Sequence, residues 1–221
     1  MHQSLQKLSF IQNKISEILD KTQLKINPKI IAITKTFPIS AINPLLESGH
    51  IHYGENKIQE AENKWKGIKE KYQNVALHMV GKVQSNKAKK AIQLFDYIHS
   101  LDNLKLAKLL SRFENELNKK VKIFIQVNIA EENQKTGISL NELENFYNFC
   151  KKDLNLNIIG LMCIPPVDSD SIEYFKTLKQ YSLKLNLNDL SMGMSNDYEQ
   201  AILCGSTYLR LGTVIFGERS T

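Results

Sequence analysis

The alternation of two hydrophobic periods along the chain constrains the fold most. Short β-branched runs, typical of strands buried on both faces, alternate with segments whose apolar residues recur every three or four positions, as in amphipathic helices. The strand candidates are 29–34, 52–54, 75–80, 97–100, 121–128, 157–163, 190–192 and 208–211, and the helix candidates are 3–22, 39–48, 56–72, 84–94, 103–118, 139–152, 170–186 and 197–204. This alternation predicts parallel strands joined by right-handed helical crossovers.

The number of repeating units favours a closed barrel over an open sheet. Eight strand–helix units predict an α/β fold, a (β/α)8 TIM barrel, with residues 3–22 as an extra N-terminal helix. A chain of 221 residues is short for such a barrel, so we expect trimmed loops and a leading helix in the place of a long eighth helix. Because no linker-like or low-complexity stretch divides the sequence, residues 1–221 predict a single domain.

Composition excludes several classes of protein. Hydrophobic residues make up 42% and charged residues 24% of the chain, which is ordinary globular usage and not that of a disordered chain. The three cysteines, Cys150, Cys163 and Cys204, form no CxxC pair, which argues against a structural zinc cluster and suits reduced thiols. No apolar run reaches the ~18 residues of a membrane span, and the first residues lack a signal-peptide core. We therefore expect a cytoplasmic protein without a membrane partner.

The net charge of +6 raises the question of a nucleic-acid partner. Of the 29 basic residues, 26 are lysine and only three are arginine, whereas base-edge recognition relies on arginine. The densest basic stretch, residues 64–90, has a helical pattern over much of its length. We interpret it as a solvated lysine-rich surface and expect no nucleic-acid partner.

In a parallel barrel the functional residues lie at the carboxyl ends of the strands. The clusters that follow strand candidates are Lys35-Thr36, Gly54-Glu55-Asn56, Gly81-Lys82, Asn128, Ile164-Pro165-Pro166, Gly193-Met194-Ser195 and Gly212-Thr213. Lys35 directly follows an apolar strand, so we expect a partly desolvated amine with a lowered pKa, which is nucleophilic enough for Schiff-base chemistry. The alternative is a lysine that extends its amine into solvent.

Two strand ends favour a phosphate site. Ser195 precedes a helix after the seventh strand, where its hydroxyl and the following backbone N–H groups suit an anion. Taken alone, a serine or asparagine at this position is more commonly a plain helix cap. Gly212 and Thr213 follow the eighth strand, and a glycine there lets an anion approach the backbone. Many barrels bind phosphate between these same two loops, so together the residues predict a phosphate-binding cradle.

Three further residues have two interpretations each. Arg210 lies within the apolar eighth strand and needs a partner, which is either a carboxylate inside the barrel or a ligand. Asn56 either caps a helix or hydrogen-bonds a ligand, and an isolated His78 on an apolar strand is more often a core residue than a ligand-binding one. No set of ligands at metal-binding spacing occurs near His50 or His52, so we predict no metal site.

Seven stretches carry a family resemblance. They are AITKTFP (32–38), HYGENKIQEAENK (52–64), HMVGKVQSNKAKK (78–90), VNIAEENQKTGI (127–138), GLMCIPP (160–166), LSMGMSNDYEQAI (190–202) and LRLGTVIFGER (209–219). In this order they resemble the pyridoxal phosphate homeostasis protein family (the YggS/PROSC type), which is similar to the barrel domain of alanine racemases and to the fold-type III decarboxylases. Val214, where the family often has alanine, and the short IPPV segment depart from the pattern at positions without an expected role.

The resemblance implies a cofactor, pyridoxal 5′-phosphate (PLP), and a role for each matching residue. Lys35 matches the lysine that forms the internal aldimine, and Arg210 matches the arginine that faces the pyridine nitrogen. The other matching residues are Ser195, Gly212 and Thr213 for the phosphate, Asn56 beside the ring, and His78 and Met194 as pocket-lining positions.

The resemblance also implies a function: a carrier or buffer of PLP in vitamin B6 homeostasis, a monomer that passes PLP to apo-enzymes. One alternative is a PLP-dependent amino-acid racemase. Alanine racemases take their second base from a tyrosine of another domain, and Tyr53 is the nearest tyrosine to the predicted site in this sequence. A Schiff-base aldolase is a further alternative, and it differs from the first two in predicting a colourless protein.

Overall fold

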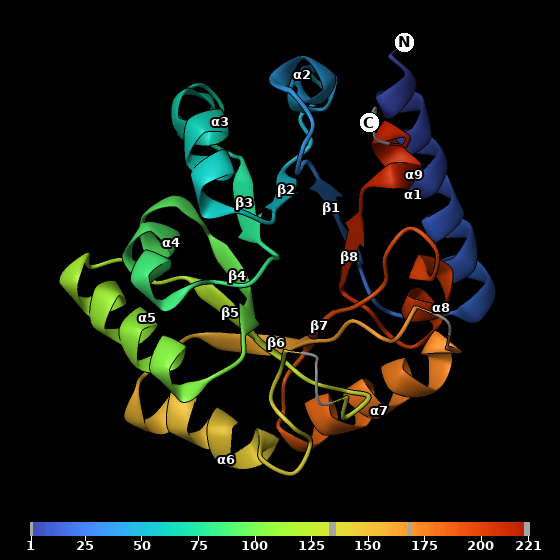
Figure 1. Cartoon of the computed structure of the whole chain (residues 1–221). Coiled ribbons are helices and arrows are strands. Elements are labelled where there is room, and N and C mark those ends of the chain that lie inside the picture. Colours follow the sequence, from blue (N-terminus) through green and yellow to red (C-terminus); the bar gives the residue numbers. More distant parts are fainter. Residues whose placement is uncertain (1, 133–135, 168, 219–221) are drawn as a thin grey trace.

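The computed structural model describes residues 2–132, 136–167 and 169–218, so the middle of the 127–138 motif lies outside the described residues. Eight parallel strands form a closed barrel in chain order, with β8 beside β1 (Figure 1). The strands are β1 (Lys29–Ile33), β2 (His52–Glu55), β3 (Ala76–Met79), β4 (Tyr97–Leu101), β5 (Lys122–Gln126), β6 (Ile158–Met162), β7 (Asp189–Ser191) and β8 (Tyr208–Leu211). The predicted (β/α)8 barrel is confirmed.

Helices surround the barrel on its outside (Figure 1). They are α1 (Gln3–Thr22), α2 (Ile39–Glu47), α3 (Ile58–Lys71), α4 (Ala88–Leu94), α5 (Leu104–Glu116), α6 (Leu143–Asn148), α7 (Ser171–Lys184), α8 (Tyr198–Leu203) and α9 (Thr213–Phe216), with a 3₁₀ turn at Ser85–Lys87 and a π-helical turn at Phe149–Asp153. No helix among the described residues is both long and apolar enough to cross a membrane.

The N-terminal helix α1 covers the barrel beside α9, the short helix that follows β8. Its buried face, which includes Leu8, Ile11 and Ile15, packs against α2, α8 and α9 (Figure 1). Helix α9 spans four residues and covers little of the strands on its own. The extra N-terminal helix is therefore present as predicted, at the place where a longer eighth helix would lie.

The hydrophobic core has two layers because successive strand side chains point to opposite faces. The outer layer lies between strands and helices, and the inner layer fills the barrel with Ile31, Ile33, Tyr97, Phe124, Met162 and Tyr208. Gly54 on β2 makes room for this filling, because a Cβ atom there would lie 2.5 Å from Cδ1 of Ile33. The inner layer also contains the buried His78 and His99, which connect to the site described below.

Candidate functional site

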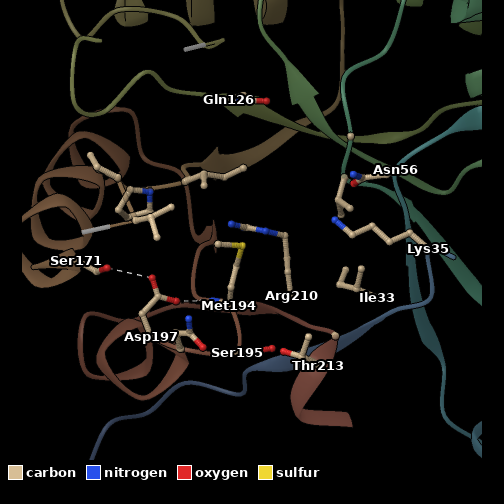
Figure 2. Close-up of a pocket in the computed structure, with 18 of the residues that line it drawn as sticks. Ile33, Lys35, Asn56, Gln126, Ser171, Met194, Ser195, Asp197, Arg210 and Thr213 are labelled. Carbon is tan, nitrogen blue, oxygen red and sulfur yellow. Dashed lines mark hydrogen bonds between the residues drawn. The ribbon is translucent and has the colours of Figure 1, made fainter. Parts of the chain in front are cut away.

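A cavity of about 710 Å³ lies at the carboxyl ends of the strands (Figure 2). Its volume is typical of small-molecule sites, which span about 300–1,000 Å³. Seven of the eight predicted site residues line it: Lys35, Asn56, Met194, Ser195, Arg210, Gly212 and Thr213. The eighth, His78, does not line the cavity and is fully buried inside the barrel.

Lys35 lies half-buried at the end of β1, next to a strained residue. Thr36 has φ 69°, a left-handed conformation that is unfavourable for a β-branched side chain. Its backbone N–H donates a 2.7 Å hydrogen bond to the Glu60 carboxylate of α3, which holds this turn in place. Figure 2 shows the Lys35 amine reaching into the cavity on the same side as Asn56. The strain thus lies next to the lysine that sequence reasoning selected.

Two hydroxyl groups converge on another wall of the cavity. Figure 2 shows the Ser195 and Thr213 oxygen atoms facing one another. The Ser195 hydroxyl also accepts a long hydrogen bond, 3.5 Å, from the backbone N–H of Val214, which ties the loop after β7 to α9. The loops that follow the last two strands therefore meet here, as the sequence predicted.

Asp197 organises the loop after β7, and sequence reasoning missed it. One carboxylate oxygen accepts the backbone N–H of Met194 at 2.6 Å, and the other accepts the hydroxyl of Ser171 at 3.0 Å (Figure 2). An aspartate in the sequence SND is a common turn residue, and that was the available signal. Its link to Ser171 joins segments 26 positions apart and is visible only in the fold.

Arg210 is a buried cation with neutral partners. Its guanidinium donates to the Ser191 hydroxyl at 2.7 Å and to the Cys163 carbonyl at 2.9 Å, and the residue is 5% exposed. Among the residues that the structure describes, no ion pair joins it to a carboxylate, although the negative charge of Asp197 acts on its pKa in the opposite direction to burial. Burial lowers its pKa from the usual value, yet an arginine remains protonated. A buried charge of this kind favours an electron-rich ligand atom in the cavity.

The cavity as a whole is electropositive. Its lining includes three cationic side chains, Lys35, Lys82 and Arg210, and one carboxylate, Asp197. A concave site with an excess of positive charge attracts anionic ligands. No group of three or more metal-ligating side chains occurs within the described residues.

Sequence reasoning also assigned no role to other lining residues. They are Ile33, Phe37, Val80, Gly81, Lys82, Gln126, Thr136, Ile164, Pro165, Pro166, Val167, Ser169, Ser171, Asn196, Asp197 and Gln200. Several of these residues belong to the clusters that follow predicted strands. That position was the only feature of the sequence that could have identified them as part of the site. Gln126 donates to the Thr136 hydroxyl at 2.8 Å and shapes the wall near β5.

Known proteins resemble this chain over nearly its whole length. The family described as alanine racemase, N-terminal domain, matches residues 7–220. A Synechocystis relative named pyridoxal phosphate homeostasis protein is 38% identical over 200 residues, which are 86% of this chain and 91% of the relative.

Solved structures show the same relationship. The structure of PipY from Synechococcus elongatus PCC7942 with PLP bound is 33% identical, has a TM-score of 0.81 and covers 92% of this chain and 100% of that one. An alanine racemase of Clostridium difficile 630, 11% identical with a TM-score of 0.73, covers 98% of this chain and 58% of that one, and shows the shared fold alone. The chain therefore belongs to the alanine racemase N-terminal domain family and, within it, to the pyridoxal phosphate homeostasis proteins.

Proposed function

We propose that this chain binds PLP and acts in the cytoplasm as a carrier or buffer in PLP homeostasis. The observation that carries the proposal is the convergence of an amine, two hydroxyls and a buried guanidinium on one cavity. Relatives named pyridoxal phosphate homeostasis proteins, and the PipY structure with PLP bound, support the same conclusion.

The residues of the cavity fit the chemical groups of PLP. The cofactor has an aldehyde, a phosphate ester and a pyridine nitrogen, which require an amine, hydrogen-bond donors and a donor or acceptor respectively. Lys35 supplies the amine, Ser195 and Thr213 supply hydroxyl donors, and Arg210 supplies a donor whose present partners are neutral. Gly212 lies beside these hydroxyls and leaves space for a bulky anion.

Each side chain then has a defined task. Bound PLP supplies an aldehyde that condenses reversibly with amines and releases water. Lys35 holds the aldehyde carbon covalently and yields it to a competing amine, while Ser195 and Thr213 retain the phosphate. Asn56 and Met194, which also line the cavity, would border the ring. A reactive aldehyde is thereby kept from other cellular amines and remains transferable to apo-enzymes, and we propose that a monomer suffices for this.

A racemase of the alanine racemase type is the alternative, because this chain shares its barrel fold. Racemisation at Cα requires a base on each face of the substrate, and Lys35 can serve one face. Among the described residues that line the cavity there is no tyrosine. Tyr53 is fully buried, packs its ring 4.9 Å from that of Trp65 and lies outside the cavity lining, so it is not placed as the second base. We therefore propose a carrier without robust turnover.

The first experiment identifies the lysine. Purified protein loaded with PLP is treated with borohydride, which makes a carbon–nitrogen link permanent, and the modified peptide is found by mass spectrometry. We expect the adduct on Lys35, and loss of the visible absorption band in Lys35→Ala. Lys82→Ala is the matched control, since Lys82 also lines the cavity, and it should keep the band. An adduct on another lysine with Lys35 unmodified would falsify the assignment.

The second experiment separates carrier from enzyme. Exchange of the Cα proton of L-alanine in deuterated solvent and chiral analysis of the product measure turnover. We expect a rate far below ~1 s⁻¹, the lower end of ordinary enzyme rates. Sustained turnover above that rate, abolished in Lys35→Ala, would replace the carrier by a racemase.

A further inference from the structure

A continuous chain of hydrogen bonds crosses the inside of the barrel and ends at Arg210. Nδ1 of His52 lies 2.9 Å from Nε2 of His78, and Nδ1 of His78 lies 2.9 Å from Nε2 of His99. Nδ1 of His99 lies 2.8 Å from the hydroxyl oxygen of Ser191, which accepts the guanidinium of Arg210 at 2.7 Å. The chain thus links the start of β2, at the amino end of the barrel, to the cavity at its carboxyl end.

The inner part of this chain is rigidly packed. His78, His99 and Ser191 are buried, with exposed fractions of zero. The ring of His78 stacks on Tyr97 with centroids 4.1 Å apart, and the ring of His99 stacks on Phe124 with centroids 4.3 Å apart. Because both rings lie between aromatic neighbours, their nitrogen atoms are fixed toward the next member of the chain.

The three imidazoles are neutral at ordinary pH. Burial lowers the pKa of His52 to about 4, with further lowering by the charges of His50, Lys29 and Lys122. Burial likewise holds the pKa values of the two inner histidines well below the usual range. A neutral imidazole has one N–H donor and one lone-pair acceptor. A ring that accepts a hydrogen bond at one nitrogen therefore donates from the other, so the direction of one bond fixes the direction of the next.

Arg210 determines that direction. A guanidinium only donates, so the Ser191 oxygen is the acceptor of that bond. The buried Ser191 hydroxyl proton then has one partner among the described residues, Nδ1 of His99. The opposite orientation would leave this buried proton without an acceptor, which is unfavourable. His99 is therefore protonated at Nε2 and donates to His78, which in turn donates from its own Nε2 to His52.

We propose that Ser191, His99 and His78 are positioning residues that form one polarised hydrogen-bond chain. Arg210 sets the direction of donation along this chain. In return, the chain orients the Arg210 guanidinium toward an acceptor atom of the ligand. Donors and acceptors aligned in one direction strengthen one another in a buried environment. In PLP the acceptor is the unprotonated ring nitrogen, so this last step rests on the proposed function.

The direction of the chain is tested first on protein stripped of cofactor. Long-range ¹H–¹⁵N correlation spectra of histidine-labelled protein distinguish a protonated from an unprotonated ring nitrogen. We expect His78 and His99 to be protonated at Nε2 and unprotonated at Nδ1. A proton on Nδ1 of His99 in the unmodified protein would overturn the proposal, and this result requires no variant.

Two variants test which end imposes the direction. Arg210→Met removes the obligatory donor while it keeps much of the side-chain volume, and such replacements of buried charges are often tolerated. We expect a mixture of tautomers at His99 in this variant. His52→Gln changes the opposite end and should leave the His99 tautomer as it is. A single Nε2–H tautomer in Arg210→Met, or a change at His99 in His52→Gln, would show that Arg210 does not set the direction.

The effect on the ligand is tested separately. Ser191→Ala breaks the link between Arg210 and the histidines. Because the guanidinium then loses a partner that orients it, we expect about a tenfold rise in the dissociation constant of PLP, which corresponds to ~1.4 kcal/mol. Ser182→Ala is the matched control, because the Ser182 hydroxyl is equally buried but bonds only to the Leu187 carbonyl. Equal dissociation constants for Ser191→Ala and Ser182→Ala, measured by equilibrium dialysis, would overturn the positioning role. The tautomer measurement uses no PLP, so its result is independent of the proposed function.

Discussion

Gly212 tests the phosphate site at the scale of a single residue. Its φ of −118° suits any amino acid, and a Cβ atom there would meet only Ile33, at 3.5 Å. The fold therefore accepts a side chain, but the branches beyond Cβ would extend into the cavity. We expect Gly212→Leu to weaken PLP binding at least about tenfold while the free energy of unfolding changes by less than about 1 kcal/mol.

The control for this substitution is Gly67→Leu. Gly67 lies on the exposed face of α3, where an added Cβ meets no atom within 4 Å. We expect unchanged PLP affinity in this variant. Affinity is measured by equilibrium dialysis and stability by urea denaturation. Undiminished affinity in Gly212→Leu would place the phosphate elsewhere in the cavity.

At the scale of single residues, the sequence predicted which side chains lie at the cavity better than it predicted their hydrogen-bond partners. Lys35, Ser195 and Thr213 were found because the carboxyl ends of parallel strands converge in a closed barrel. The surroundings of Arg210 were left open, since its partners Ser191 and Cys163 come from two other strand regions. Partners of this kind depend on which residues face one another across the barrel, and a linear pattern does not contain that information.

The joint between β2 and α3 gives a prediction at the scale of secondary-structure elements. Glu55, fully buried at the end of β2, accepts hydrogen bonds through one oxygen from Lys64 at 2.9 Å, Trp65 at 3.0 Å and Thr34 at 2.7 Å. This network fixes α3 and the end of β1 just before Lys35. We expect Lys64→Met to destabilise the fold by roughly 3 kcal/mol, because it leaves a buried carboxylate without its cation.

A surface pair provides the comparison. Lys90→Met breaks the ion pair with Glu62, whose side chains are 43% and 38% exposed, and we expect little change in the urea midpoint. The double variant Glu55→Gln/Lys64→Met should recover much of the lost stability, since no buried charge remains unpaired. Equal midpoints for Lys64→Met and Lys90→Met would contradict a structural role for the Glu55 network.

Element boundaries were predictable where the chain follows one period without interruption. The segment 139–152 was expected to be one helix, but α6 begins only at Leu143. Ile138 instead pairs its backbone with Gln126 and Asn128 at the end of β5, which delays the helix, and the last turn widens into the π-helical Phe149–Asp153. Tertiary pairing thus overrode the local pattern, and the hydrophobic period alone gives no sign of it.

At the scale of the whole molecule, the barrel interior makes stability depend on pH. His52, His78 and His99 have pKa values lowered by burial, so the unfolded chain, in which a histidine titrates near 6.5, binds more protons than the folded one below that pH. Unfolding free energy should therefore fall as the pH drops from 7 toward 5, by up to about 1.4 kcal/mol per pH unit for each histidine. For His52 this loss ends near its folded pKa of about 4.

Urea denaturation measures how the unfolding free energy depends on pH. The measurements are made at about pH 7.5, 6.5 and 5.5, which lie above, at and below the pKa of a free histidine. We expect a steadily falling midpoint. The slope should be shallower in His52→Gln, which removes one of the four histidines whose pKa burial lowers (His50 is the fourth) but keeps a polar side chain at the accessible end of the chain. Most carboxylates titrate below this range, so they contribute little to the change. A midpoint that stays constant between these pH values would mean that the barrel accommodates protonated histidines, and the neutral, directional chain that ends at Arg210 would then not exist in solution.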